Sequence, residues 1–246
     1  MQTLHGPAAV LAATNSHPYA RFGVSLSDGA HVRGAAEAGA VVWVGRSPYG
    51  WVAHGLGDVS TVVDLVDRAD FLGEVRWINL PRHDPGPGYV RNEEWDLLWA
   101  TSPAPPQPGG ERVVPVDDEA AVGALLDVAF PDAGVRPGSP HVLGWYGVWA
   151  DGSLVACAAD RSTRAPGVGP VGVIGGVAVH PQHRRSGLGA AVTGELTRRL
   201  QQTHDMVALG VDASNTAAIR MYERLGYAGR HEVTSVRPST VEAAEA

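Results

Sequence analysis

Hydrophobic residues in the second half of the chain follow two alternating spacings. Residues 171–179 are almost all apolar, which predicts a buried strand. Beyond them, apolar residues recur every four positions and predict one face of a helix: Leu188, Val192, Leu196 and Leu200. Shorter runs predict strands at 112–116, 145–150, 154–159 and 207–211, and helices at 117–130 and 215–225. We therefore expect a mixed α/β fold in this half.

Turn and cap residues lie where these elements should begin and end. Asp151-Gly152 separates two strand runs and favours a hairpin. Asn215 is suited to cap a helix, and Gly226 is suited to the left-handed conformation just past its end. The inner face of that helix would carry Ala218, Met221, Tyr222 and Leu225.

A segment rich in proline and glycine divides the chain. Residues 101–110 read TSPAPPQPGG, which suits neither a helix nor a central strand. We therefore expect an N-terminal α/β domain at 1–100, a linker at 101–110 and a second domain at 111–246. Strand runs at 41–44, 75–80 and 95–99, with a strand, turn and helix over 51–66, suggest that the first domain is a smaller, degenerate copy of the second. Asp58 is expected to cap that helix.

Composition excludes several kinds of chemistry. All 19 cationic side chains among the 246 residues are arginine, so a Schiff base or a P-loop lysine is excluded. The net charge of −7 argues against nucleic-acid and membrane partners, and the ten histidines show no metal-binding spacing, so no metal is expected. The single cysteine, Cys157, fits a small buried side chain in a reducing compartment, and no secretory signal is readable after Met1. We expect a cytoplasmic protein.

The turn between the apolar run and the following helix predicts an anion site. Backbone amides at a helix start, together with the helix dipole, attract phosphate. Gly187 and Gly189 would let phosphate approach the backbone, and Arg184 and Arg185 add positive charge. The arrangement suits a pyrophosphate. The spacing of these residues differs from the dinucleotide-binding fingerprint, so a dinucleotide site is disfavoured. An ordinary connection with solvated arginines is the alternative.

Two ordered motifs resemble the GNAT superfamily of acyl-CoA-dependent N-acyltransferases. The first is Q/R-x-x-G-x-G/A, which follows a central strand that ends near V-x-P. Val179 and Pro181 match the end of the strand, and Arg184, Gly187 and Gly189 match the signature. The second is a downstream pattern matched by Asn215, Ala218, Tyr222 and Gly226-Tyr227. The resemblance covers about residues 111–236 and looks closest to the branch with glycine N-acyltransferase-like domains.

This resemblance implies an acetyl-CoA site. The pantetheine arm would lie in a gap along the central strand, against Val177, Ala178 and Val179, and Asn215 would contact the arm. The pyrophosphate would be held by the backbone of Arg185, Ser186, Gly187, Leu188, Gly189 and Ala190. Tyr222 would give a proton to the departing thiolate, because a phenol keeps its proton at neutral pH. Simple packing in the core is the alternative for Tyr222.

The base for the attacking amine is left open. The family often has a glutamate in the central strand, where this chain has Ile174, Gly175 and Gly176. Asp212 is the first candidate, although a turn-capping role also fits it. His180 and Asp160 are further candidates, and water would suffice for an amine that arrives neutral.

The expected function is transfer of an acetyl group from acetyl-CoA to a primary amine, by a monomer or homodimer. The acceptor would be a small molecule or a peptide N-terminus, entering between residues 131–145 and 230–235. Candidate pocket residues are Arg136, His141 and Trp145. A noncatalytic acyl-CoA sensor or interaction module, and a transferase of longer acyl groups, are the alternatives.

Overall fold

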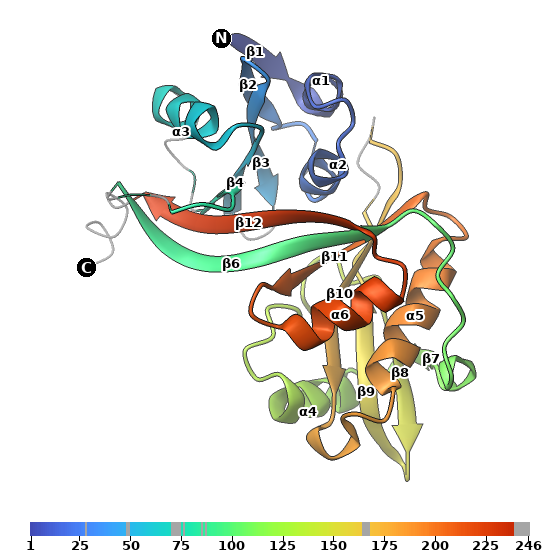
Figure 1. Cartoon of the computed structure of the whole chain (residues 1–246). Coiled ribbons are helices and arrows are strands. Elements are labelled where there is room, and N and C mark those ends of the chain that lie inside the picture. Colours follow the sequence, from blue (N-terminus) through green and yellow to red (C-terminus); the bar gives the residue numbers. More distant parts are fainter. Residues whose placement is uncertain are drawn as a thin grey trace.

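A computed structural model describes residues 1–27, 29–47, 50–69, 75, 77–84, 86, 88–163 and 168–238. The described strands form one twelve-stranded mixed sheet with helices packed on both faces (Figure 1). The fold is therefore of the mixed α/β class, as predicted. Within the described residues, no helix combines the length and apolar composition that a bilayer span requires.

The N-terminal half supplies the first six strands and three helices. The strands are β1 (Gln2–His5), β2 (Arg33–Glu37), β3 (Ala40–Ser47), β4 (Gly50–Leu56), β5 (Trp77–Pro81) and β6 (Tyr89–Ala100). The helices are α1 (Gly6–Ala13), α2 (Pro18–Ser25) and α3 (Val59–Arg68). The predicted cap of α3 is confirmed, because Asp58 Oδ1 accepts a hydrogen bond of 3.0 Å from the Thr61 amide.

The C-terminal half contains every element that the hydrophobic pattern predicts there. Its strands are β7 (Val114–Val116), β8 (Gly144–Ala150), β9 (Ser153–Asp160), β10 (Val171–Val179), β11 (Met206–Asp212) and β12 (Gly229–Pro238). Its helices are α4 (Glu119–Ala129), α5 (Leu188–Leu200) and α6 (Thr216–Arg224). The predicted cap of α6 is confirmed by the 3.2 Å hydrogen bond from the Ala218 amide to Asn215 Oδ1, and Gly226 has a φ of +94°.

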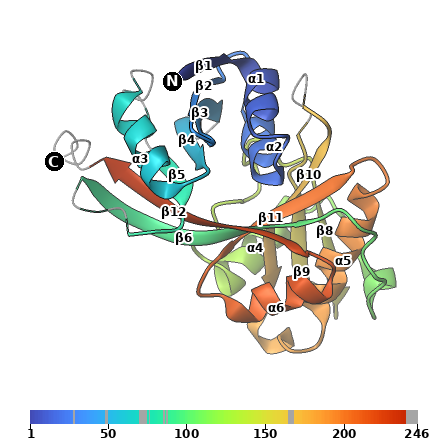
Figure 2. The ribbon, with the colours of Figure 1, turned by 45° about the horizontal axis from the view of Figure 1, so that its top comes forward.

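Each half gives its last strand to the other half. The sheet order is β1-β2-β3-β4-β5-β12-β6-β11-β10-β9-β8-β7, so β12 lies beside β5 and β6 lies beside β11 (Figures 1 and 2). The neighbouring pairs β4–β5 and β10–β11 are parallel and the others are antiparallel. Counted inward from either edge of the sheet, five strands of one half follow in chain order, the fourth and fifth of them are parallel, and the sixth strand comes from the other half. The first half therefore repeats the strand order of the second. The domain division at 101–110 stays a prediction, because the sheet continues through both halves.

The helices cover both faces of the sheet, and helices from both halves pack against β10. α5 and α6 pack on one face, over a core that includes Leu98, Leu196 and Leu209. α4 packs on the opposite face against β9 and β10. α2, from the N-terminal half, contributes to a core that includes Val173 of β10 and Met206 of β11. Side chains of both halves can therefore contribute to one site.

Candidate functional site

A gap opens in the sheet where β10 and β11 separate. The two strands pair only from Val171 with Met206 to Ile174 with Leu209. Beyond this point β10 continues along β9 through a bulge, in which Gly176 has a φ of +58°. β11 meanwhile stays paired with β6 as far as Asp212. The side of residues 175–179 that faces β11 therefore has no strand to bond, and an extended ligand could occupy that place.

The start of α5 presents a row of free backbone amides beside this gap. Gly187 caps the helix with a φ of +83°, and the first helical hydrogen bond runs from the Ala191 amide to the Gly187 carbonyl. The amides of residues 185–190 have no acceptor among the described residues. A Cβ added to Gly187 would meet no protein atom within 4 Å. The turn is therefore open to an anion at the positive end of the helix dipole.

The two predicted arginines of this turn have different environments. Arg184 is tied to the protein, because its Nη2 donates to the Ala129 carbonyl at 3.0 Å and its Nε to the Val179 carbonyl at 3.4 Å. Arg185 is exposed and makes no polar contact with the described residues. Arg185 is thus the cation available to a bound phosphate. Gly189 has a packing role as well, since an added Cβ would lie 3.3 Å from Met221 Sδ.

Tyr222 is a buried phenol with an unused hydroxyl. It lies on the inner side of α6, and burial raises the pKa of Tyr222 to about 12. Its neighbour Tyr227, 5.9 Å away between ring centroids, shares a 2.8 Å hydrogen bond with the Thr197 hydroxyl. The Tyr222 hydroxyl has no such partner among the described residues. It therefore keeps a donor available for a ligand.

All three candidate bases are engaged in local turns. Asp212, His180 and Asp160 each accept a hydrogen bond from the backbone amide two positions later, at 2.7, 3.3 and 2.8 Å respectively. Asp212 also accepts from the Ser214 hydroxyl, and these hydrogen bonds lower the pKa of Asp212. A lowered pKa makes a carboxylate a weaker base. The structure therefore favours the capping role of Asp212 over the catalytic one.

A cavity of about 300 Å³ lies between the halves. Residues of α2 and of strands β3 to β6 form the wall on the side of the N-terminal half. The C-terminal half contributes Ser235 of β12, His141 and Arg161. Arg161 lies between the cavity and the gap in the sheet. It lines the cavity, and its Cδ lies 2.8 Å from where a Cβ of Gly175 would be. His141 and Ser235 come from the region predicted for the acceptor. The residues from the N-terminal half, including Glu93 and Asn79, had no local sequence signal that could reveal them.

The other two candidate pocket residues have structural contacts. The Arg136 guanidinium pairs with the Asp127 carboxylate and donates to the Pro131 carbonyl at 3.0 Å. Trp145 is buried, and its indole lies 2.8 Å from where a Cβ of Gly176 would be. Trp145 therefore packs against the bulge of β10, and this close contact requires glycine at position 176.

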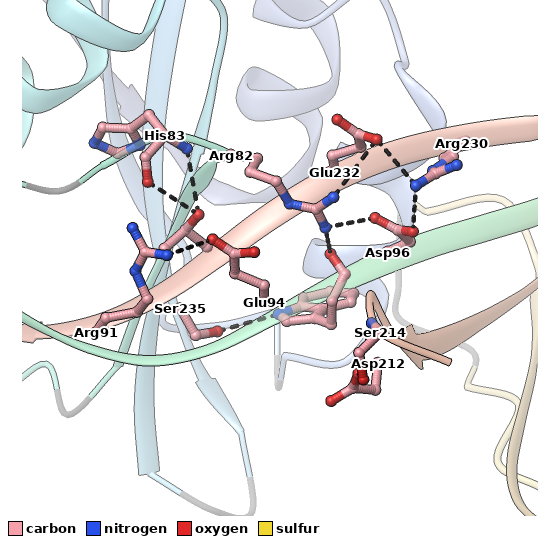
Figure 3. A network of polar contacts seen from close by, with 12 residues as sticks. Arg82, His83, Arg91, Glu94, Asp96, Asp212, Ser214, Arg230, Glu232 and Ser235 are labelled. Carbon is pink, nitrogen blue, oxygen red and sulfur yellow. Dashed lines mark hydrogen bonds and ion pairs between the residues drawn. The ribbon is translucent and has the colours of Figure 1, made fainter. Parts of the chain in front are cut away.

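An ion-pair network holds the exchanged strands together (Figure 3). Buried Asp96 of β6 lies 2.6 Å from Arg82 Nη2 and 2.7 Å from Arg230 Nη2. Glu232 of β12 joins the same two arginines. The network therefore links β12, β6 and the residue that follows β5. No group of three or more histidine, cysteine or acidic residues in the described ranges is placed to hold a metal ion.

Comparisons with known proteins agree with this fold. Residues 152–236 match the family described as FR47-like protein. A GNAT-family structure from Novosphingobium aromaticivorans shares 23% identity over 94% of this chain and 97% of its own, with a TM-score of 0.55. The chain has the GNAT fold. A GCN5-related N-acetyltransferase from Kribbella flavida gives 21% identity, coverage of 87% and 92%, and a TM-score of 0.53. The GNAT resemblance is thus confirmed at the level of fold.

Curated relatives match this GNAT-fold chain over part of their length. A mycothiol acetyltransferase from Salinispora tropica is 31% identical over 156 residues, which cover 54% of this chain and 51% of the relative. One from Thermobispora bispora is 45% identical over 60 residues, which cover 24% and 20%. The chain thus spans between a fifth and a half of the length of these relatives.

Proposed function

We propose that this GNAT-fold chain transfers an acetyl group from acetyl-CoA to a primary amine. The observation that carries the proposal is the row of unpaired amides at residues 185–190, which follows the stretch of β10 that runs without β11 as its neighbour. Separated strands offer main-chain partners to an extended pantetheine arm, and a helix start offers amides to a pyrophosphate. Both parts of coenzyme A thus have a complementary surface in the required order.

Individual residues would divide the binding work. Val177, Ala178 and Val179 would line the pantetheine arm, and the amides of residues 185–190 would hold the pyrophosphate with help from Arg185. Arg184 would shape the turn through its two carbonyl contacts. The Asn215 side-chain oxygen is used by the cap of α6, so its contact with the arm would come from its amide nitrogen.

The chemistry would be direct attack of a neutral amine on the thioester carbonyl. The carbon–nitrogen bond forms, the carbon–sulfur bond breaks, and the sulfur leaves as a thiolate. Tyr222 would stabilise this sulfur by hydrogen bonding, and the pKa of about 12 keeps its phenol protonated throughout the neutral range. Because a thiol is the stronger acid, the hydrogen bond itself, rather than a complete transfer from an isolated phenol, supplies most of the stabilisation.

The acceptor would occupy the cavity between the halves. The polar side chains that line this cavity, which include two histidines, two asparagines, Arg161 and Glu93, suit a small polar amine. The names of the curated relatives make mycothiol-related amines the first acceptors to test. A peptide N-terminus would be the second class of acceptor to test. We place the reaction in the cytoplasm, where the buried free thiol of Cys157 stays reduced.

Release of free coenzyme A with a panel of amines tests this function. We expect turnover with acetyl-CoA and at least one small amine, and slower turnover with longer acyl donors. Binding of acetyl-CoA without release of coenzyme A with any acceptor would contradict the transferase and favour an acyl-CoA sensor. Equal rates with acetyl and octanoyl donors would contradict the preference for acetyl groups.

A further inference from the structure

The proposed reaction lacks a base on the strand that often carries one. An amine is protonated at neutral pH, and it must lose a proton before it can attack. At the corresponding part of β10 this chain has Gly175 and Gly176, which leave room for Arg161 and Trp145 instead of a carboxylate. The three candidates from the sequence are held in turns, as described above. Among the residues that line the cavity, the carboxylate is that of Glu93.

Glu93 occupies the required place. It lies on β6, opposite Ser235 of β12 and two positions from Trp95, which is the partner of Asp212 at the last residue of β11. Glu93, Trp95 and Ser235 all line the cavity. The carboxylate therefore lies at the end of β11, on the side of the gap where the acceptor would enter.

A polar row across the sheet ends at Glu93. His54 of β4 pairs in register with Asn79 of β5, Asn79 with Ser235 of β12, and Ser235 with Glu93 of β6. The Ser235 hydroxyl donates to Asn79 Oδ1 and accepts from Trp95 Nε1 at 3.1 Å. The row forms one wall of the cavity. Because β6 is the exchanged strand, the N-terminal half brings this carboxylate to the C-terminal gap.

Of the three acidic residues Glu93, Glu94 and Asp96 on β6, Glu93 is the one without an ion pair to a described residue. Glu94 pairs with Arg91, and Asp96 pairs with Arg82 and Arg230 (Figure 3). The Glu93 side chain has no ion pair or hydrogen bond with the described residues, and it remains open to solvent. Its two carboxylate oxygens are free to accept a proton or to bind an ammonium group.

The surroundings of Glu93 favour its protonated form. Partial desolvation by the cavity wall and then the negative charge of Asp212 raise the pKa of Glu93. The other titratable or charged groups around the cavity are His54 on β4, His141 before β8 and Arg161 after β9. A carboxylate with a raised pKa is a stronger base than an ordinary one. Its environment thus fits proton abstraction better than that of Asp212.

We propose that Glu93, supplied by the N-terminal half, accepts the proton of the acceptor ammonium group, directly or through one water molecule. This inference rests on the proposed function. One amine proton passes to the carboxylate and then to solvent. The neutral nitrogen attacks the carbonyl carbon from the cavity. The nitrogen that has attacked loses its second proton to solvent, the carbon–sulfur bond breaks, and the thiolate, hydrogen-bonded by the Tyr222 hydroxyl as it leaves, takes up a proton from solvent.

The pH dependence of Glu93→Gln tests the proposal. With an amine that the wild type acetylates, we expect the variant to lose about 100-fold in kcat/KM at pH 7. The deficit should shrink as the pH approaches the pKa of the amine, because the free amine then needs no base. Acetyl-CoA should still raise the Tm of the variant by the wild-type amount. The matched control is Glu94→Gln, since Glu94 is the adjacent carboxylate but pairs with Arg91.

Each outcome separates this proposal from the proposed function. No turnover by the wild type with any amine would reject the transferase function itself. An active wild type with an unimpaired Glu93→Gln variant would overturn the role of Glu93. So would a deficit that stays constant at every pH, because a merely structural role would not be rescued by deprotonation of the acceptor. Glu93→Asp should retain more activity than Glu93→Gln at pH 7.

Discussion

Ile174 of β10 and Leu209 of β11 are the last two residues at which these parallel strands pair. Residues that follow Ile174 lead to the free amides of α5, and residues that follow Leu209 lead to Asp212 and the neighbourhood of Glu93. The separation of one strand pair therefore creates the place that we propose for the coenzyme arm, and β11 leads from it toward the cavity that we propose for the acceptor. Tyr222 lies with the α5–α6 core, and the acceptor cavity involves α2 and β6.

Tyr222→Phe should lower kcat about 100-fold with little change in the Kd of acetyl-CoA. The phenol is expected to act on the sulfur mainly in the transition state, and the ring would keep its packing. Wild-type kcat should also show no falling limb from Tyr222 between pH 7 and 10, because the protonated form persists below its pKa of about 12. Single-turnover kinetics and calorimetric binding check both points. Unchanged kcat would show that Tyr222 only packs in the core.

Arg185→Ala should weaken acetyl-CoA binding about 5-fold, which corresponds to ~1 kcal/mol for an exposed charge-assisted contact. Arg184→Ala serves as the comparison, because that side chain is tied to the Ala129 and Val179 carbonyls. We expect it to lower the Tm more than Arg185→Ala does. Titration calorimetry at low and high salt measures the difference. A larger affinity loss in Arg184→Ala, at unchanged Tm, would reverse the assignment of the two arginines.

Asp96→Asn should reduce the free energy of unfolding by about 2–3 kcal/mol. Breaking a fully buried ion pair costs more than this, but Arg82 and Arg230 retain 22% and 39% exposure and can be partly solvated. Urea denaturation measures the loss. The control, Glu94→Gln, removes a surface pair and should cost under about 1 kcal/mol. Equal losses in the two variants would show that the network does not hold β6 and β12 together.

Unfolding should become easier as the pH falls below 6.5. Burial lowers the pKa of His54 to about 3 and the pKa of His231 to about 4. Between these values and 6.5 the unfolded chain binds protons that the folded chain does not bind. Each histidine therefore removes up to about 1.4 kcal/mol of stability per pH unit as the pH decreases. Urea unfolding at pH 7, 6 and 5 should show a shallower dependence for His54→Gln, and identical slopes would contradict the assignment.

Local signals were sufficient for the elements of the C-terminal half. The four-residue spacing from Leu188 to Leu200 specifies α5, and Asn215 and Gly226 mark the ends of α6. The turn glycines were likewise readable, because Gly187 combines a positive φ with free space around it. α1 was not predicted, since Gly6–Ala13 is rich in alanine and has no clear polar face.

The strand exchange and the cavity between the halves could not be predicted from such local signals. β6 and β12 pair across more than a hundred residues, and nothing in the pattern of either strand specifies its partner. Glu93 therefore could not be separated from Glu94 in the sequence. Their difference arises from the alternation of side chains along β6, which leaves one carboxylate on the cavity and the other beside Arg91.

The most direct test of the site is the rise in Tm that acetyl-CoA produces in Gly187→Val. Gly39 provides a matched control, because it has the same φ of +83° and the same free space around an added Cβ, but lies in the turn between β2 and β3. Both substitutions should lower the Tm of the free protein through backbone strain. We expect only Gly187→Val to abolish the acetyl-CoA-dependent rise, since its side chain would stand where the pyrophosphate meets the amides. A full rise in Gly187→Val would contradict coenzyme binding at the start of α5.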